Sequence, residues 1–232
     1  MKIAILGYGK MGKVIEKIAL ERGHEIVLKI DNSHIEFDIT SADIAIEFSV
    51  PEAAVNNIKL CINNQIPIIS GTTGWLEHFD EMKQLCLQKN GSFIYASNYS
   101  LGVNLFFELN IHLAKLMNKF NQYDICLEEI HHTQKLDAPS GTALTLANQI
   151  IQNSDKKTWS LNPKNKEELR ITSKRMGNYP GTHSVIYTSE NDEIEIKHTA
   201  FNREGFAIGA VIAAEWLLNK KGVFTMKDVL GI

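Results

Sequence analysis

Two histidines, a lysine and a helix-opening turn lie close together between residues 128 and 142 of this 232-residue chain. His131 and Lys135 carry side chains that can transfer protons near neutral pH when their surroundings favour it. The apolar residues Ile125 and Leu127 predict a buried strand that leads into this pair. We therefore expect the segment to bring proton donors to a reaction site.

A helix is expected to begin directly after these residues. Pro139, followed by a helical pattern of apolar side chains, predicts a helix that starts near Ser140. The first turn of a helix presents backbone N–H groups that have no intrahelical partner, at the positive end of the helix dipole. We therefore expect Ser140, Gly141 and Thr142 to bind an anionic group, either a carboxylate or a phosphate.

The paired histidines have two other interpretations. Neighbouring residues of a strand point to opposite faces, so either His131 or His132 could be a packed or surface imidazole. Zinc is the second interpretation, because His183 and His198 are also present. No cysteine or carboxylate spacing completes a ligand set, and we predict no metal site.

The N-terminus has the pattern of a dinucleotide-binding unit. A short apolar strand, residues 3–6, precedes a Gly-x-Gly-x-x-Gly loop and an amphipathic helix, and a second strand, residues 25–30, ends at Asp31. This order and the spacing from Gly12 to Asp31 favour dinucleotide binding over a plain turn. The residues expected to contact the cofactor are Gly7, Tyr8, Gly9, Lys10, Met11 and Gly12.

Asp31 bears on the choice between NADH and NADPH. Its carboxylate could accept hydrogen bonds from the ribose hydroxyls and would repel a 2′-phosphate, which favours NADH. Lys10 or Lys29 could supply a compensating charge, or both could be solvated surface lysines. The preference between the two cofactors therefore stays open.

Strands at residues 44–48, 67–69 and 93–96 alternate with helices at 52–61 and 77–88. This rhythm predicts a parallel sheet with crossover helices, and residues 1–100 form a Rossmann unit. Ligands of such sheets lie at the carboxyl ends of the strands. Further cofactor contacts are therefore expected from Phe48, Gly71, Thr72, Thr73, Ala96, Ser97, Asn98 and Tyr99.

The second half has an α+β rhythm. A helix at residues 101–120, the histidine strand and the Ser140 helix are followed by a polar loop, residues 153–166. Antiparallel strands are expected at 183–187 and 194–198, joined by a turn at 190–192. A final helix, residues 206–218, is expected to return to the first unit. The predicted domains are a dinucleotide-binding Rossmann domain (1–100 plus 206–232) and a substrate-binding and oligomerisation domain (101–205).

The bulk properties exclude several functional classes. The net charge of −3 argues against a nucleic acid or an anionic membrane as the main partner. No apolar run approaches a membrane span, and the N-terminus shows no targeting leader, so a cytoplasmic location is expected. Cys61, Cys86 and Cys126 form no Cys-x-x-Cys pair and are expected to be reduced thiols without a role.

Taken together, these motifs resemble those of the 4-hydroxy-tetrahydrodipicolinate (dihydrodipicolinate) reductase family of the bacterial diaminopimelate and lysine pathway. The resemblance covers nearly the whole chain, and the run from the two histidines to the Ser140 helix is its most specific part. It rests on residues 7–12, 71–74, 98–104, 129–143, 175–177, 181–183, 198–200, Arg203 and 206–207.

The resemblance implies hydride transfer from NADH or NADPH to a cyclic, unsaturated dicarboxylate, with loss of the substrate hydroxyl as water. It assigns acid/base roles to His131 and Lys135. It also implies that His132 and the helix start at Ser140, Gly141 and Thr142 hold a substrate carboxylate, and that the chain forms a homotetramer through the sheet of the second domain.

Three departures from the family pattern concern the cofactor. The segment from Asp31 to Ile44 is short compared with many members, Glu47-Phe48-Ser49 replaces a more usual Asp-Phe-Thr, and no arginine directly follows Asp31. Two rival functions remain open. One is another Rossmann dehydrogenase of the aspartate or homoserine type, which would keep its activity without Lys135. The other is a non-catalytic, dinucleotide-binding regulator.

Overall fold

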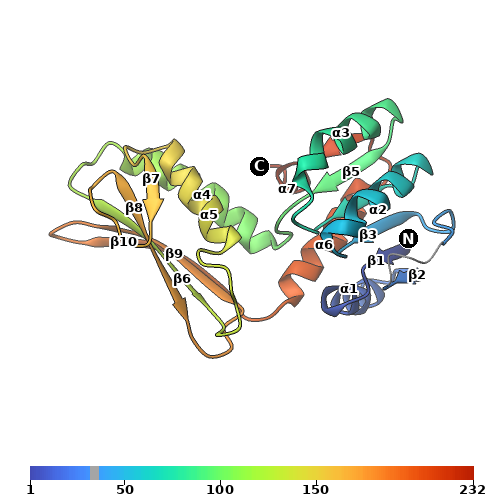
Figure 1. Cartoon of the computed structure of the whole chain (residues 1–232), viewed down its shortest axis with the longest axis horizontal. Helices are drawn as coiled ribbons and strands as arrows, with labels where there is room; N and C mark the ends of the chain where they lie inside the picture. The colour runs from blue at the N-terminus through green and yellow to red at the C-terminus, as the bar shows by residue number, and fades with distance from the viewer. Residues whose placement is uncertain (32–36) are drawn as a thin grey trace. The chain divides into compact units, whose positions relative to one another are not determined.

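The computed structural model describes residues 1–31 and 37–232 (Figure 1). The chain divides into two compact units. Unit 1 contains Met1–Leu101 and Arg203–Ile232, and unit 2 contains Gly102–Asn202. Each unit has its own sheet and its own buried core.

Unit 1 is built on a six-stranded parallel sheet in the order β11-β5-β4-β3-β1-β2. The strands are β1 (Lys2–Leu6), β2 (Glu25–Ile30), β3 (Ile44–Glu47), β4 (Ile68–Ser70), β5 (Ser92–Tyr95) and β11 (Gly222–Phe224). The helices are α1 (Lys10–Glu21), α2 (Pro51–Asn63), α3 (Phe79–Gln88), α6 (Glu204–Leu217) and α7 (Met226–Leu230), with a 3-10 turn at Leu76–His78.

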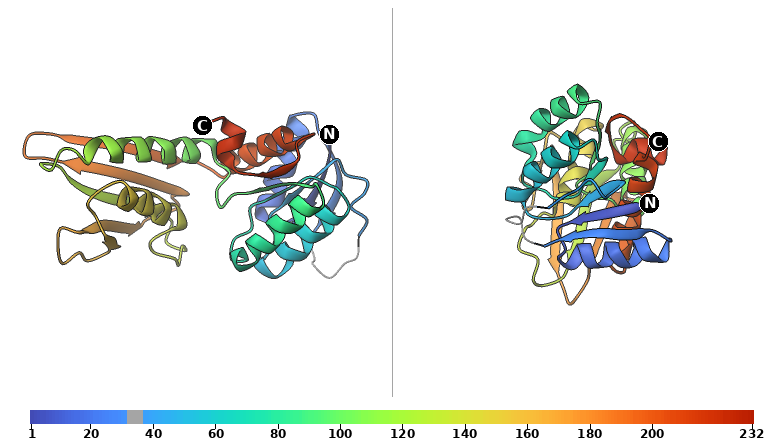
Figure 2. Two further views of the ribbon diagram at one scale, coloured as in Figure 1. Left: turned by 90° about the horizontal axis from the view of Figure 1, so that it is seen from above. Right: turned by 90° about the vertical axis from the view of Figure 1, so that its right-hand side faces the viewer.

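Helices cover both faces of this sheet (Figure 2), which explains the nearly continuous apolar strands. Ile3 and Ile5 pack on the face that α1 and α6 cover, whereas Ala4 and Leu6 pack on the α2 and α3 face. Alternate residues of a strand point to opposite faces, so one short strand contributes to two cores. The predicted parallel α/β unit is confirmed.

The strand order fixes where a ligand of unit 1 would bind. β1 has β2 on one side and β3 on the other, so the chain reverses its winding direction between β1 and β3. In open parallel sheets, ligands bind outside the carboxyl ends of the strands at such a switch point. The glycine loop at residues 7–9 follows β1 directly at this edge.

The predicted final helix is α6, and it belongs to the core of unit 1. Its small-residue face allows a close approach: a Cβ added to Gly209 would lie 1.7 Å from the carbonyl oxygen of Tyr99. The strand β11 and the helix α7, which follow it, were not predicted. Both are very short, so neither shows a periodic pattern.

Unit 2 has a five-stranded mixed sheet in the order β10-β9-β6-β8-β7. β6 pairs antiparallel with β9 and parallel with β8. The elements are α4 (Leu101–Met117), β6 (Asp124–His131), α5 (Gly141–Gln152), β7 (Thr158–Ser160), β8 (Glu168–Arg175), β9 (Gly181–Thr188) and β10 (Glu193–Ala200). The first residue of α4 belongs to unit 1.

The odd-numbered residues of β6 form the buried row of unit 2. Ile125 and Leu127 pack with apolar residues of α4 and α5, and Glu129 and His131 continue the same row with polar groups. A core-facing row that ends in a carboxylate and an imidazole needs polar partners nearby. The sheet therefore positions these two side chains beneath the start of α5.

Three expectations for unit 2 were inaccurate. α4 ends at Met117 rather than at residue 120, and β7 lies inside the segment predicted to be a polar loop. β8 was missed, because Leu169 and Ile171 are its only apolar residues and the strand therefore gives a weak signal. The antiparallel strands β9 and β10 and the helix start after Ser140 are confirmed.

None of the helices in the described part of the chain combines the length and apolar character needed to cross a membrane.

Candidate functional site

A buried carboxylate lies at the centre of the polar cluster in unit 2. Glu129 has no exposed surface. The backbone N–H of Ser140 donates to both of its oxygens, at 3.2 and 3.1 Å, and Arg175 Nη2 donates to Oε1 at 3.1 Å. The carboxylate therefore joins the end of β6, the start of α5 and the end of β8.

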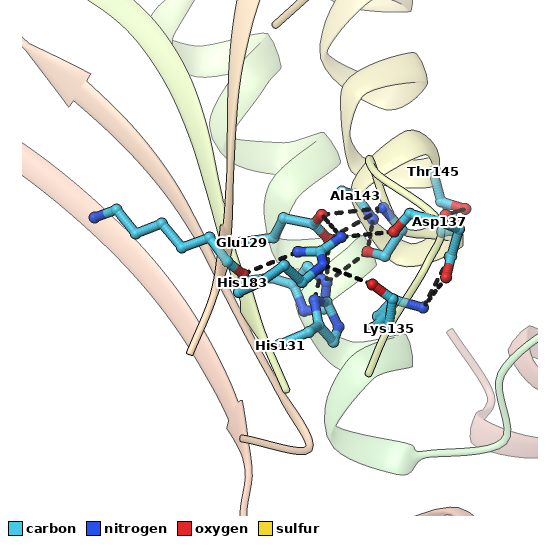
Figure 3. A network of polar contacts seen from close by, with 11 residues as sticks. Glu129, His131, Lys135, Asp137, Ala143, Thr145 and His183 are labelled. Atoms are coloured by element: carbon cyan, nitrogen blue, oxygen red, sulfur yellow. Dashed lines mark hydrogen bonds and ion pairs between the residues drawn. The ribbon is translucent and has the colours of Figure 1, made fainter. Parts of the chain in front are cut away.

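Two imidazoles lie against the same carboxylate (Figure 3). His131 Nδ1 is 3.3 Å from Glu129 Oε2, and His183 Nε2 is 3.7 Å from that oxygen. The two rings meet edge to face with centroids 5.0 Å apart. His183 Nε2 also lies 3.0 Å from Ser140 Oγ.

Burial alone would raise the pKa of Glu129, but the polar groups around the carboxylate, His131, His183, Ser140 and Ser173, outweigh this effect and hold its pKa well below its usual range. Burial lowers the pKa of His183, and the carboxylate of Glu129 offsets only part of this effect. At neutral pH the cluster therefore contains an ionised carboxylate beside a neutral His183.

The depressed pKa of Glu129 predicts an acid-dependent loss of stability. The unfolded carboxyl titrates near pH 4.5, so the stabilisation is complete above that pH and is lost as the pH falls toward the lower folded pKa. Below pH 4.5, wild type should lose about 1.4 kcal/mol of unfolding free energy per pH unit from this group. Glu129→Gln should lack this dependence. Urea unfolding at a series of pH values measures it.

The matched control for that experiment is Glu128→Gln. Glu128 is the preceding residue of β6, on the opposite face, where it pairs with Lys174. This variant should keep the wild-type acid dependence. Equal acid dependence in wild type and Glu129→Gln would contradict the prediction.

Lys135 lies in the irregular segment between β6 and α5. Its Nζ donates to both carboxylate oxygens of Asp137, at 2.7 and 2.8 Å. The Lys135 side chain is about one-fifth exposed, and that of Asp137 is more exposed. The ammonium is therefore paired with the carboxylate of Asp137, which was not predicted, rather than with a histidine.

The start of α5 is already partly occupied by groups of the chain. Ser140 caps the helix by accepting from the N–H of Ala143, and its own N–H binds Glu129. These contacts make Ser140 a structural residue of the helix start. The N–H groups of Gly141 and Thr142 lie in the first turn, where a helix offers them no backbone acceptor, and they remain the candidates for an external anion.

His132 is the remaining predicted substrate contact. Its backbone N–H donates to the carbonyl of Tyr179 at 2.9 Å, which fixes the main chain. Its Nδ1 is buried and has no hydrogen-bond partner among the described residues. A buried polar atom without a partner is costly, so a ligand that fills this need would bind favourably.

The glycine loop of unit 1 has the geometry of a dinucleotide cradle. Gly7 has φ +99°, and a Cβ there would lie 2.1 Å from the carbonyl oxygen of Phe48. A Cβ at Gly12 would lie 2.3 Å from the carbonyl oxygen of Gly7. A Cβ at Gly9 would meet nothing within 4 Å, so the backbone of this helix-capping residue is open to a ligand. The loop therefore fits a pyrophosphate at the start of α1.

The remaining loop residues surround this opening. Tyr8 donates its hydroxyl to Glu16, and Lys29 Nζ binds the same carboxylate at 2.9 Å while lying 5.0 Å from the Tyr8 ring centroid. Glu16 therefore already neutralises Lys29, one of the two lysines considered for a 2′-phosphate. Lys10 is exposed, and Met11 is half-buried in the first turn of α1.

Asp31 follows β2 directly and is exposed at the same sheet edge. The position after it, which lacks the arginine of the family pattern, belongs to residues 32–36, outside the described residues.

A second group of predicted contacts follows β3 and β4. Phe48 packs its ring over Gly71, where a Cβ would lie 2.2 Å from that ring, and against Tyr99 at 5.6 Å between centroids. Tyr99 is only 1% exposed. Its side chain therefore belongs to the core of unit 1, and Phe48 is the more accessible aromatic group.

Glu47 connects the loops that follow β3 and β4. It is fully buried, and it accepts from the hydroxyls of Ser70 and Thr72, at 2.6 and 2.8 Å, and from the N–H of Ser49 at 3.0 Å. The carboxylate therefore ties together the carboxyl ends of β3 and β4. The hydroxyl of Thr72 is used internally, whereas Thr73 is exposed.

The loop after β5 contains the last predicted contacts. Ala96 and Asn98 are half-buried, and Ser97 is exposed. Asn98 Oδ1 accepts from the N–H of Ser100 at 2.9 Å, which shapes the loop. Because β5 is parallel to β4, the loop after β5 lies at the same edge of the sheet as the other predicted cofactor contacts.

Within the described residues, Glu129, His131 and His183 form one group whose ligand atoms lie within 4.8 Å of one another, close enough for a metal ion. The pairing of His183 with a carboxylate in this cluster was not foreseen. Arg175 already neutralises the carboxylate, and a guanidinium at 3.1 Å opposes a divalent cation by charge repulsion.

His131, His132 and Lys135 were therefore predicted from the sequence, whereas Glu129, Asp137 and Arg175 were not. Strand periodicity could have indicated Glu129, which lies two residues before His131 and so faces the same side. Asp137 lies two residues after Lys135. Arg175 gave no local signal, because only the pairing of β6 with β8 brings it to the site.

The sequence of this chain matches two profiles of one protein family. The family profile described as dihydrodipicolinate reductase, N-terminus, matches residues 1–99, and the C-terminus profile matches residues 102–230. Together they cover nearly all of the chain.

Individual relatives agree with these profiles. The 4-hydroxy-tetrahydrodipicolinate reductase of Christiangramia forsetii is 54% identical over 99% of this chain and 98% of its own. That of Thermosipho africanus is 35% identical with the same coverage. The structure of a dipicolinate-bound dihydrodipicolinate reductase from Paenisporosarcina sp. TG-14 matches with a TM-score of 0.77 at 22% identity, over 97% of both chains, which supports the fold.

Proposed function

The chain belongs to the dihydrodipicolinate reductase family, and we propose that it reduces 4-hydroxy-tetrahydrodipicolinate to tetrahydrodipicolinate with NADH or NADPH. The observation that carries this proposal is the cluster around Glu129. It combines the cationic Lys135, two imidazoles and the open N–H groups of Gly141 and Thr142. A small dicarboxylate needs such oriented donors and cations.

The residues of unit 2 divide the work between binding and proton transfer. His132, Gly141 and Thr142 hold a substrate carboxylate, while Ser140 builds the helix start that presents those N–H groups. Lys135 and His131 supply the proton to the position that gains negative charge during reduction, and the substrate hydroxyl leaves as water. The bound nicotinamide supplies the hydride.

The residues of unit 1 hold the cofactor. Gly7, Gly9 and Gly12 shape the pyrophosphate cradle, with Tyr8, Lys10 and Met11 beside it, and Asp31 binds the adenosine ribose. The loops after β3, β4 and β5 complete the site through Phe48, Gly71, Thr72, Thr73, Ala96, Ser97, Asn98 and Tyr99. Tyr99 and Thr72 act there mainly by supporting the loops.

Asp31 is expected to set the cofactor preference. Asp31→Ala should weaken NADH binding by about 10-fold, the value of one hydrogen bond to a charged group, and should improve NADPH binding because it removes a repulsive charge. Titration with 5′-AMP and 2′,5′-ADP measures the ribose contact without turnover. Glu25→Ala, at the exposed amino end of β2, should change neither affinity. Unchanged affinities in Asp31→Ala would remove Asp31 from the site.

We also propose that the chain forms a homotetramer. α4 and α5 pack on one face of the unit 2 sheet, and the other face carries the half-buried apolar residues Ile130 and Ile186, which a neighbouring sheet would cover. We further propose a cytoplasmic location, because a biosynthetic reductase needs the cellular pool of reduced nicotinamide. Light scattering that gives the mass of a single chain would contradict the tetramer.

A steady-state assay tests the function as a whole. The purified chain should oxidise NADH or NADPH when it receives substrate that the preceding synthase generates in the cuvette. Turnover of aspartate or homoserine instead would favour another Rossmann dehydrogenase. Tight NADH binding without turnover, unaffected by His131→Ala, would favour a dinucleotide-binding regulator.

A further inference from the structure

Arg175 contacts more than the buried carboxylate of Glu129. Its Nη2 donates to Glu129 Oε1 at 3.1 Å and to the carbonyl of Asp137 at 2.6 Å, while its Nε lies 3.3 Å from the carbonyl of Lys135. The Arg175 side chain therefore binds the main chain both at Lys135 and at Asp137, within the segment between His131 and Gly141.

The two ends of the segment between His131 and Gly141 are anchored, because the N–H of Thr133 donates to the carbonyl of Gly177 and the N–H of Ser140 binds Glu129. Arg175 holds the part between these two anchors. The chain between His131 and Gly141 has no helix or strand, so its position depends on individual hydrogen bonds. The N–H of Lys135 donates to the carbonyl of His132 within the same segment, which shapes the turn but does not anchor it to the sheet. Arg175 lies on β8, directly opposite His131 of β6. The guanidinium therefore connects the segment to the rigid sheet.

Glu129 holds the guanidinium in place. The carboxylate is fully buried, its pair with Arg175 is mostly removed from solvent, and the N–H of Ser140 binds it from the other side. Only an arginine offers a planar set of donors that can reach a carboxylate and two carbonyls together. A lysine would keep the charge but would lose this geometry.

We propose that Arg175 is a positioning residue that fixes the main chain of Lys135 and thereby the place of its ammonium, with Glu129 as the counter-ion that orients it. The proposal rests on the role of Lys135 as proton donor given above. Arg175 acts through Lys135, and its contribution disappears when the lysine side chain is absent.

A double-mutant cycle tests this dependence. Arg175→Lys should lower kcat about 10- to 100-fold, the cost of a displacement of about 1 Å at a reacting group. Adding Arg175→Lys to Lys135→Ala should cause no further loss, because no ammonium remains to be positioned. Losses that multiply in the double variant would overturn the proposal.

The matched control is Arg170→Lys, the same substitution at an exposed position of β8. It should leave kcat, the melting temperature and the Kd of NADH unchanged. Arg175→Lys should also keep the wild-type Kd of NADH, because unit 1 holds the cofactor. Arg175→Gln, which also lacks the guanidinium, gives the same cycle if the lysine variant fails to fold.

Amide hydrogen exchange of the apo chain provides a readout that needs no catalysis. In Arg175→Lys, the amides from Lys135 to Asp137 should exchange faster, while those of β6 should keep their protection. Unchanged exchange in this segment would overturn the proposal. An inactive wild type with the expected exchange pattern would instead contradict the proposed function alone.

Discussion

Replacement of Lys135 by alanine is expected to lower kcat by about 10²- to 10⁴-fold, the usual contribution of a positioned proton donor. The Kd of NADH should stay unchanged, because the lysine lies in unit 2 and the cofactor loops lie in unit 1. Steady-state kinetics with enzymatically generated substrate measure the first quantity, and fluorescence titration of NADH measures the second.

The neighbouring residue supplies the control for that experiment. Leu136 is 97% exposed, so Leu136→Ala changes the same segment without removing a packed or charged group. This variant should keep wild-type kinetics. Near wild-type kcat in Lys135→Ala would show that the lysine does not take part in proton transfer. It would then favour a Rossmann dehydrogenase of the aspartate or homoserine type, which does not depend on this lysine.

Gly9→Ala is expected to weaken cofactor binding while leaving the fold intact. The added methyl group meets no protein atom within 4 Å, and φ at this position is −80°, which alanine adopts without strain. It would instead occupy the space of the pyrophosphate. Overpacking of this kind costs about 1–3 kcal/mol, or about 10- to 100-fold in the Kd of NADH. Isothermal titration measures the Kd, and thermal melting checks the fold.

Gly7→Ala should behave differently, although it lies only two residues away. Its φ of +99° is unfavourable for alanine, and the new Cβ would lie 2.1 Å from the carbonyl oxygen of Phe48. Backbone strain of this kind costs about 1–3 kcal/mol before any steric clash. We expect both the melting temperature and the cofactor affinity to fall. Wild-type affinity in Gly9→Ala would show that the loop does not face the cofactor.

The sequence predicted unit 1 more completely than unit 2 for a physical reason. A parallel sheet covered on both faces needs strands that are nearly all apolar, such as β1 from Ile3 to Leu6, and these give a strong signal. β8 has only one apolar row, so its sequence resembles a polar loop. β11 has three residues, too few for any period to appear.

Only some of the candidate site residues could be predicted from the sequence. His131 and Lys135 were found because reactive side chains lie close together in the sequence next to a helix start. Glu129 was missed, because a glutamate in a strand usually faces solvent and its burial depends on partners that other segments supply. Arg175 lies forty positions after Lys135, and only strand pairing brings the two together.

The two segments that build unit 1 come from opposite ends of the chain, which affects how the protein is made. On the ribosome, β5 emerges long before β11, its partner in the sheet. At about 5–20 residues per second, the interval is on the order of ten seconds. Throughout it the nascent sheet has an unpaired edge at β5, and Ile94 and Tyr99 lack the apolar cover of α6. The incomplete unit therefore exposes a strand edge and core residues until its C-terminal segment has been made.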